Sequence, residues 1–422
     1  MILRYGLRVV APVLSVTLVH ATAMSVFAAA PRTGSWRAWL DSPGGELPFG
    51  MELDQQQGRW RAYIINGDER IEVPRVTWDG HELVLDIDYY DSKITAKPSA
   101  DGSILDGQWK KRGRKDRWTQ MPFHAKVGKA RRFGRAAGPG TVPSGHGVDG
   151  RWDVRFSKSE DAAVAVFDRQ SRDTITGTFL TLGGDYGFLS GSLDGDRLRL
   201  AGFDGAHAFL FDARIQQDAT LKGDFWSGDA WHETWTAQRN PDASLPDGFG
   251  RSKWTGDKQL SSLVFPDLEG KPRSLNDPAF RGRARIIEAF GSWCPNCHDA
   301  SRYLVELQQR YGERGLKVLG LAFELSGDFK RDAGQVRKYA ARHGVTYPLL
   351  VAGTPDKEKV AAALPGLDRL RAFPTTIFLN AKGQVHAVHS GFSGPATGDA
   401  YQKLRAKYEA VIEELLADKL PP

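Results

Sequence analysis

Cysteine is nearly absent from this 422-residue chain: there are two, Cys294 and Cys297, separated by two residues. A long exported protein that uses cysteine for its architecture places several along the chain at varied spacings. Here no third cysteine is left to pair with either thiol. The two cysteines therefore close on each other, stay open and reactive, or hold a metal or haem.

A long apolar run is also missing. Residues 9–19 form a short apolar segment that follows Arg4 and Arg8 and leads into small residues ending at Ala30. This layout is typical of a secretory signal cleaved near Ala28, whereas a membrane-spanning helix needs about 20 apolar residues. No cysteine follows the run to carry a lipid anchor. The sequence predicts a signal peptide over residues 1–28 and a soluble, exported, periplasmic protein.

The net positive charge of the chain is concentrated in one stretch. The formal net charge is +6, yet residues 110–135 alone hold eleven basic residues against one acid, Asp116. Such a stretch can bind a polyanion or a membrane surface. Because it has few interleaved aromatic residues, we interpret it as a solvated hairpin tip and linker. Nucleic acid is not an expected partner of an exported protein.

Two glycine- and proline-rich stretches, residues 127–150 and 240–256, divide the chain. The segments on either side of the first stretch resemble each other at offsets of 115 to 117 residues, which indicates a duplication. The matching segments are 78–85 with 193–200, 105–109 with 221–225, and 117–119 with 234–236. Two copies are too few for a solenoid. The predicted repeats are residues 33–126 and 151–239.

Within each repeat, short alternating runs are separated by Asp-Gly and Gly-Gly turns, a pattern that predicts antiparallel hairpins. We expect two β-meanders packed as a barrel or sandwich. Ten of the twelve tryptophans fall in this half. We favour packing within the sheets over an aromatic ligand platform as their role. The ligand or partner of the β-rich half is unknown from the sequence.

Residues 257–420 have a different sequence pattern, in which predicted strands and helices alternate and an antiparallel hairpin follows. This order predicts an α/β domain with a mixed sheet. The predicted strands are 285–290, 316–323, 347–351, 375–380 and 384–390, and the predicted helices are 296–311, 328–343 and 401–416. The fold class is therefore multidomain, with an all-β duplicated region followed by an α/β domain.

Cys294 follows a predicted buried strand and stands where a helix begins. Free backbone N–H groups and the helix dipole stabilise a thiolate there, and the pKa of such a cysteine falls from about 8.5 toward roughly 3.5–7.5. Two intervening residues bring Cys297 one turn into the helix. We expect Cys294 to be the exposed nucleophile and Cys297 the shielded resolving thiol of a redox-active disulfide.

Three segments carry a resemblance to a known family: FGSWCPNC at 290–297, FPTTIF at 373–378 and GFSGP at 391–395. From about residue 260 to 416 the chain is similar to the TlpA/ResA-like exported disulfide reductases of the thioredoxin fold. The resemblance implies that Pro374 is a cis-proline facing the disulfide. It also implies that the Phe373 backbone pairs with a substrate strand, and that Trp293, Pro295 and Thr375 contact the substrate.

Glu288 lies six residues before Cys294, and the resemblance implies that it is the buried acid that exchanges a proton with the resolving thiol. The alternative is a salt-bridged residue at a strand edge. The chain departs from the ResA pattern at Ala300, where many relatives carry an acid. Glu324, at the end of the next strand, is a candidate to replace that acid in part.

Other chemistries fit parts of the same pattern. The letters CPNCH match c-type haem attachment with His298 as axial ligand. A zinc site would need two more ligands, for which His386 and His389 are candidates, although a surface position on their hairpin is favoured. A redoxin peroxidase would need a threonine two or three residues before its attacking cysteine, and this motif does not provide one. An interaction protein with an accessory redox domain is the alternative outside these chemistries.

Together these features predict an exported thiol–disulfide oxidoreductase of TlpA type, and the resemblance favours the reductase direction. It needs no cofactor and no metal. Its expected partners are protein thiols or disulfides and a membrane-embedded dithiol electron donor.

Overall fold

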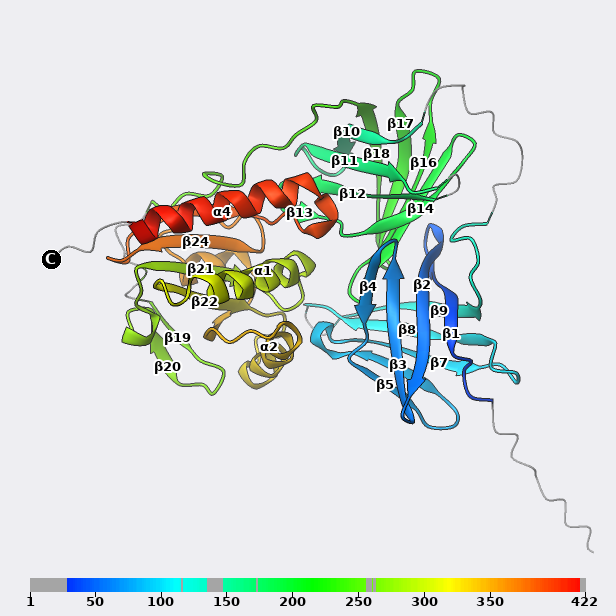
Figure 1. The fold of residues 1–422 in the computed structure, drawn as a ribbon, viewed down its shortest axis with the longest axis horizontal. Helices are drawn as coiled ribbons and strands as arrows, with labels where there is room; N and C mark the ends of the chain where they lie inside the picture. Colours follow the sequence, from blue (N-terminus) through cyan, green and yellow to red (C-terminus); the bar gives the residue numbers. More distant parts are fainter. Residues whose placement is uncertain are drawn as a thin grey trace, which may run out of the picture.

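The computed structural model describes residues 29–114, 117–134, 147–171, 174–255, 260 and 263–417. These residues form two β-sheet lobes and an α/β domain that packs beside both (Figure 1). The predicted signal peptide lies outside the described residues. Within the described part of the chain, no helix has the length and apolar character needed to span a bilayer.

The first lobe is an open, nine-stranded antiparallel sheet, in the order β4-β3-β2-β1-β9-β8-β7-β6-β5. Its alternating residues, such as Ala38, Leu40, Leu83 and Leu85, are buried on the concave face. The strands are β1 (Gly34–Ser42), β2 (Gly45–Gln56), β3 (Arg59–Asn66), β4 (Glu69–Glu72), β5 (Arg75–Trp78), β6 (Leu83–Ile87), β7 (Ser92–Pro98), β8 (Ile104–Arg112) and β9 (Trp118–Val127). A 3₁₀ turn, η1 (Asp88–Tyr90), links β6 to β7.

The second lobe is a barrel, because β11 pairs with β12 and closes the sheet order β11-β10-β18-β17-β16-β15-β14-β12. The short strand β13 is attached to β12. The strands are β10 (Gly150–Phe156), β11 (Ala163–Arg169), β12 (Ile175–Thr181), β13 (Gly184–Asp185), β14 (Leu189–Asp194), β15 (Arg197–Phe203), β16 (Ala208–Ile215), β17 (Leu221–Ser227) and β18 (Trp231–Arg239). The all-β prediction is confirmed, as one half-barrel and one barrel.

The two lobes are built alike. In each, the first strand pairs with the last, and the intervening strands pair mostly in sequence. Residues 78–85 and 193–200, matched from the sequence, form the β5–β6 and β14–β15 hairpins. This shared order supports the proposed duplication. Closure differs between the lobes, since the half-barrel has no ladder joining β4 to β5 in its described strands.

The apolar core of the half-barrel includes residues of the barrel. Phe203 and Leu210, on β15 and β16, belong to the same apolar cluster as the half-barrel's own buried residues. Asn66, 1% exposed, donates from Nδ2 to the Phe203 carbonyl at 2.8 Å and accepts from the Phe203 N–H at 3.2 Å. The two lobes are therefore joined by apolar packing and by a buried amide that completes a strand's hydrogen bonding.

Several tryptophans serve this packing. Trp36, Trp109, Trp152 and Trp235 are at most 2% exposed, which confirms the favoured interpretation for these four. Trp118 and Trp231 are 44% and 47% exposed.

The basic stretch begins in the β8–β9 hairpin, as predicted, but two of its residues are not solvated. Lys111 donates to the Ala206 carbonyl at 2.9 Å, in the barrel's β15–β16 loop. Arg132 donates to the side chain of Asn66 at 3.0 Å and to the Ala201 carbonyl at 3.0 Å. That prediction was wrong for these residues because their guanidinium and ammonium groups supply hydrogen bonds between the two β lobes.

The α/β domain is built on a five-stranded mixed sheet, in the order β23-β22-β21-β24-β25. The first three strands are parallel and the last two form an antiparallel hairpin, as predicted. The elements are β19 (Val264–Pro266), β20 (Pro272–Ser274), η4 (Pro278–Phe280), β21 (Ala284–Phe290), α1 (Pro295–Tyr311), β22 (Leu316–Phe323), α2 (Phe329–His343), β23 (Leu349–Gly353), α3 (Lys357–Ala363), β24 (Thr375–Asn380), β25 (Val385–Ser390), η5 (Pro395–Thr397) and α4 (Asp399–Ala417).

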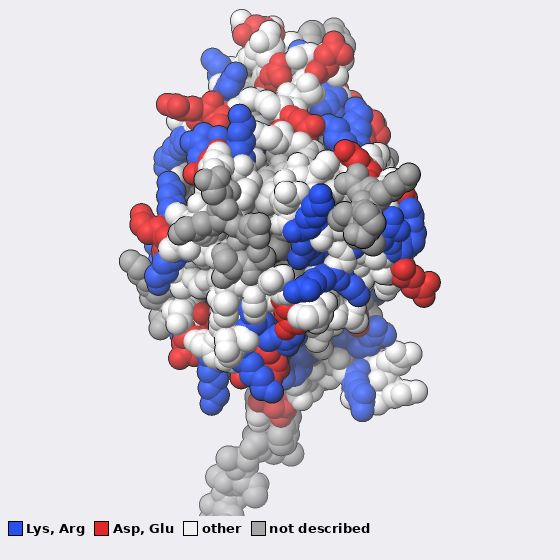
Figure 2. Space-filling model, turned by 90° about the vertical axis from the view of Figure 1, so that its left-hand side faces the viewer, with Lys and Arg blue, Asp and Glu red and all other residues white. Residues whose placement is uncertain are grey.

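Both faces of this sheet are covered. Helices α1, α2 and α4 bury one face, and α3 with the β19–β20 hairpin buries the other. The hairpin β19–β20 and α3 were not predicted from the sequence. The segment taken as a second linker also packs here, because Phe249 contacts the core beneath α4 and pairs with His389 on β25. Figure 2 shows acidic and basic side chains interspersed over the face of this domain turned away from the β lobes.

Replacing Asn66 by alanine is expected to loosen the joint between the two β lobes. The substitution leaves the buried N–H and C=O of Phe203 without partners, which costs about 3 kcal/mol of unfolding free energy. Urea unfolding followed by tryptophan fluorescence measures this change. Asn276→Ala, at an exposed position, is the control and is expected to change stability by less than about 0.5 kcal/mol. Equal midpoints for the two variants would contradict the role of Asn66.

Candidate functional site

Cys294 stands at the start of α1, as predicted. It is the N-cap residue, with extended backbone, and its carbonyl accepts from the N–H groups of Cys297 and His298 at 3.0 and 3.2 Å. Pro295 occupies the first helical position, where its missing N–H costs nothing and its fixed φ suits the helix. Both cysteines are free thiols. Cys294 therefore stands at the N-terminus of α1, and its side chain makes no capping hydrogen bond to the helix.

The prediction that Cys294 is exposed was wrong, but Cys294 is still the more accessible of the two thiols. Cys294 is 5% exposed and Cys297 is fully buried. Burial raises the pKa of Cys297 well above its usual value, and the neighbouring Cys294 raises it further. The inner thiol thus keeps its proton at neutral pH unless a base removes it.

The loop before β24 lies against the outer thiol. The Phe373–Pro374 peptide bond is cis, and the Cys294 thiol donates to the Phe373 carbonyl at 3.5 Å. Trp293 packs edge-on against the Phe373 ring at 5.5 Å and donates from its indole N–H to the Phe323 carbonyl. Thr375 is fully buried, with its hydroxyl donating to the Ala372 carbonyl. This burial does not support a substrate contact by the Thr375 side chain.

Glu288 lies beneath the two cysteines. Alternation along β21 turns it to the same face as Ile286 and Phe290, toward α1. It is fully buried, and burial raises its pKa to about 8. Its Oε1 has no hydrogen-bond partner, and Oε2 accepts only a long 3.4 Å bond from Ser301. Among the described residues no ion pair compensates it, so the salt-bridge alternative was wrong.

A hydroxyl network connects this carboxyl to the inner cysteine. Ser301 lies 2.5 Å from the Tyr339 hydroxyl, which donates to the Cys297 carbonyl at 2.7 Å. Tyr347 donates to Ser301 at 3.3 Å. No local sequence pattern indicates the Tyr339 contact, because it depends on how α2 packs against α1.

Glu324, the candidate to replace in part the acid missing at Ala300, contacts the turn before the cysteine motif. It is buried and accepts hydrogen bonds from Ser292, at 2.8 Å from the backbone N–H and at 2.6 Å from the hydroxyl. Burial raises its pKa to about 7. Glu324 therefore holds the turn that precedes Cys294, while Ala300 is buried against the sheet.

His298 is occupied by other contacts, against the haem alternative. Its Nε2 donates to the Ser292 carbonyl at 2.7 Å, so its Nδ1 accepts from His343 at 2.6 Å. Burial lowers the pKa of His298 well below its usual value, and His343 lowers it further. The ring is enclosed by Tyr89, Tyr90 and Tyr339. Neither ring nitrogen is free to ligate iron.

The two candidate zinc ligands differ in their surroundings. His386 is exposed and lies 3.5 Å from Glu414, as expected for a surface position. His389 is 4% exposed, and its Nδ1 lies 3.1 Å from the Tyr408 hydroxyl, so its predicted surface position was wrong. The described residues contain no group of three or more histidine, cysteine or acidic side chains placed to hold a metal.

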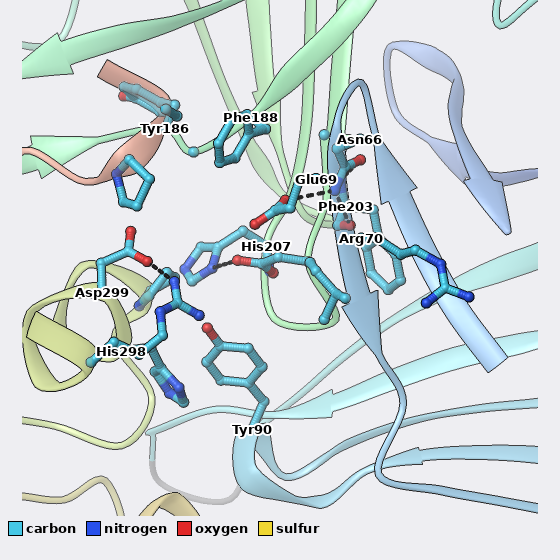
Figure 3. A pocket seen from close by; sticks show the side chains of 18 of the residues that line it. Asn66, Glu69, Arg70, Tyr90, Tyr186, Phe188, Phe203, His207, His298 and Asp299 are labelled. Carbon is cyan, nitrogen blue, oxygen red and sulfur yellow. Dashed lines mark hydrogen bonds and ion pairs between the residues drawn. The ribbon is translucent and has the colours of Figure 1, made fainter. Parts of the chain in front are cut away.

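A cavity of about 330 Å³ lies between the β lobes and the start of α1 (Figure 3). Pro295, His298 and Asp299 line it from α1, Tyr90 from the half-barrel and Tyr186 from the barrel. Most of its charged groups pair with one another: Asp299 bonds to Arg302, and Asp204 lies 3.3 Å from His207. Burial raises the pKa of Glu69, on the far wall, to about 7.

The β lobes also touch the α/β domain beside the thiols. Gln335, on α2, donates to the carbonyls of Asp88 and Tyr89 at 3.0 and 2.7 Å. Arg114 donates to the Pro355 carbonyl at 2.9 Å. In the barrel, the loop around Asp185 reaches Asn296, between the two cysteines. These contacts link segments far apart in sequence, so no local pattern predicts them.

Comparison with known proteins agrees with this geometry. Residues 242–404 match the Redoxin family model. The thiol-disulfide oxidoreductase ResA of Geobacillus thermodenitrificans is 29% identical over 129 residues, which are 31% of this chain and 66% of that protein. The ResA of Halalkalibacterium halodurans is 25% identical over 141 residues, 33% of this chain and 72% of that protein.

The chain thus spans about two thirds of the length of these curated relatives. Among solved structures, a thiol:disulfide interchange protein of the thioredoxin family from Chlorobium tepidum TLS matches 39% of this chain and all of its own length. The identity is 22% and the TM-score 0.29. The C-terminal part of this chain is therefore similar to the TlpA/ResA-like thioredoxin-fold domains of the redoxin family, and an all-β region precedes it.

Proposed function

We propose that this protein is a thiol–disulfide oxidoreductase in which Cys294 attacks and Cys297 resolves. One observation carries the proposal: the Cys294 thiol lies at a helix N-terminus against the carbonyl that precedes cis-Pro374. Behind it, Cys297 and Glu288 are buried in the same apolar layer. This is an attacking thiol with a protected partner and a proton acceptor within one site.

In the reductase direction, the Cys294 thiolate attacks one sulfur of a substrate disulfide. The other substrate sulfur leaves and takes up a proton, which gives a mixed disulfide. Cys297 then loses its proton and attacks the Cys294 sulfur, so the second substrate thiol is released. Two electrons have passed to the substrate, and a Cys294–Cys297 disulfide remains.

The second step needs a base, because burial raises the pKa of Cys297. We propose Glu288 as that base. Its pKa of about 8 lets the carboxyl be partly ionised near neutral pH, and the Ser301 hydroxyl lies beside it. The apolar surroundings that raise this pKa also keep water from competing for the proton.

The partners follow from the same chemistry. We propose protein disulfides as substrates, with an extended segment pairing along the Phe373 backbone and contacting Trp293 and Pro295. The reductase direction and export are proposed from the family resemblance and the predicted signal peptide. A reductase in an oxidising compartment must be recharged, so we propose a membrane-embedded dithiol as its electron donor.

Cys294→Ser is expected to abolish the acceleration of insulin reduction by dithiothreitol, because the attacking sulfur is gone. Cys297→Ser is expected to accumulate a stable mixed disulfide on Cys294, detected by mass spectrometry. Each variant serves as the other's control, since both remove one thiol from the same helix turn. Equal insulin reduction by wild type and Cys294→Ser would contradict the catalytic assignment.

Glu288→Gln is expected to slow the resolving step by about a hundredfold, because a neutral amide cannot accept the Cys297 proton. In the wild type the resolution rate should rise with pH until about 8, where Glu288 ionises, and then level off. Stopped-flow measurement of mixed-disulfide decay between pH 6 and 9 tests this. Glu358→Gln, which alters an exposed carboxyl on α3, is the control and should keep the wild-type profile.

The same substitution is expected to change the pH dependence of stability. Folding raises the pKa of Glu288 from 4.5 to about 8, so its favourable contribution is complete below about pH 4.5 and is lost as the pH rises through 8. Between these pH values the folded wild type binds one more proton than the unfolded chain, so its free energy of unfolding falls by about 1.4 kcal/mol per pH unit. Urea unfolding at several pH values should show that slope lost in Glu288→Gln. An unchanged slope would contradict the assigned pKa.

A further inference from the structure

The barrel segment that runs from the end of β12 through β13 to Gly187 lies on the redox domain at the cysteine motif. This barrel loop comprises residues 181–187. The Asp185 N–H donates to the Asn296 side-chain oxygen at 3.3 Å, and the Asn296 amide lies 3.4 Å from the Asp185 carbonyl. Asn296 stands between the two cysteines, so this paired contact fixes the loop to the motif itself.

The Asp185 side chain adds a second anchor. Its Oδ2 accepts from the Gly394 N–H at 2.6 Å, and its Oδ1 accepts from the Gly187 N–H at 2.8 Å, within the loop. Arg251, from the segment that joins barrel and redox domain, donates to the Leu182 carbonyl. The loop is thus held from both ends by groups of the redox side.

Glycines permit the close approach on both surfaces. A Cβ added at Gly391 would lie 2.8 Å from the Leu182 carbonyl oxygen, and one added at Gly184 would overlap the Asn296 amide. A Cβ at Gly183 would lie in ordinary contact with Ala372. Ala372 directly precedes Phe373, and the Gly391 N–H donates to the Pro374 carbonyl at 2.9 Å. The loop therefore covers the edge at which an extended substrate would pair with the Phe373 backbone.

Cys294 lies two residues before Asn296 and retains little surface for a residue at a helix terminus. Cys294 is 5% exposed, whereas attack on a disulfide requires a substrate sulfur within about 3–3.5 Å and in line with the thiolate. The loop borders a void on one side, because Tyr186 and Gly187 line the 330 Å³ cavity, while the Tyr186 ring anchors its far end against Phe209 and Phe211 of the barrel.

We propose that the barrel loop is an autoinhibitory cover, which a protein disulfide must displace before Cys294 can attack it. This inference rests on the proposed function of Cys294 and adds regulation of that site by the β region. Substrates with a flexible, extended segment are admitted, because they can replace the loop's contacts along the 373 and 391 backbone. Compact partners that offer no such segment are excluded.

Asp185→Ala and Arg251→Ala, made singly and together in the full chain, test the cover. In reduced protein, the double variant is expected to react at Cys294 about tenfold faster with a maleimide carrying a long polyethylene glycol chain, because the open population rises. Insulin reduction should rise in parallel. Asp185→Asn keeps an acceptor oxygen and should restore wild-type rates. Asp218→Ala, in another barrel hairpin, is the matched control and should have no effect.

The outcomes separate the two proposals. Unchanged modification of Cys294 in all loop variants, or slower insulin reduction in Asp185→Ala, would overturn the cover and leave the catalytic role standing. Faster modification of Cys294 without insulin reduction by any variant would support the cover and contradict the proposed activity. Mass spectrometry assigns the label to Cys294 rather than to the fully buried Cys297.

Discussion

An unpaired carboxyl in a strand buried on both faces is the constraint on which the site depends. Every residue of β21 is buried, and Glu288 stands in its middle with one oxygen lacking a hydrogen-bond partner. Burying an ionised carboxylate in such a place is costly, so the group holds its proton up to a pKa of about 8. An apolar strand would fold with less penalty. A carboxyl at this position has a use if it exchanges a proton with a neighbouring group, and the buried Cys297 thiol is that group.

The rest of the domain keeps that constraint in place. Helix α1 starts at Pro295, so the outer thiol is left at the helix terminus while the inner thiol points into the apolar layer. Tyr339 bonds to the Cys297 carbonyl and thereby ties α2 to the same turn. Glu324 holds the Ser292 turn before the motif. The attacking sulfur of Cys294 is thus separated by a single helical turn from the buried thiol of Cys297, which keeps its proton.

The β region is more than a neighbour of this site. Its two lobes share a core through Phe203 and Asn66, and both lobes reach the redox domain. The barrel places Asp185 on Asn296 and Gly394, next to the attacking thiol. A redox domain alone would leave its helix terminus open to any disulfide. Here access depends on a loop that belongs to another lobe.

Local patterns in the sequence predicted what local physics determines. The strand at 285–290 and the helix after Cys294 follow from periodicity and motif spacing, whereas the buried acid at Glu288 is implied by the family resemblance. The structure has all three. Closure of only one β lobe and the burial of His389 depend on tertiary packing, so no window of sequence contained them. The same holds for Asp185, whose partners lie 111 and 209 residues away.

The central claim is that Cys294 and Cys297 form one reversible dithiol. Equilibration of the full chain in glutathione buffers of graded potential, with acid trapping and peptide mass analysis, tests it most directly. The account predicts a single two-electron transition in which the oxidised form carries a Cys294–Cys297 disulfide and the reduced form carries two thiols. Oxidised protein that holds only glutathione adducts, with no Cys294–Cys297 disulfide at any potential, would contradict it.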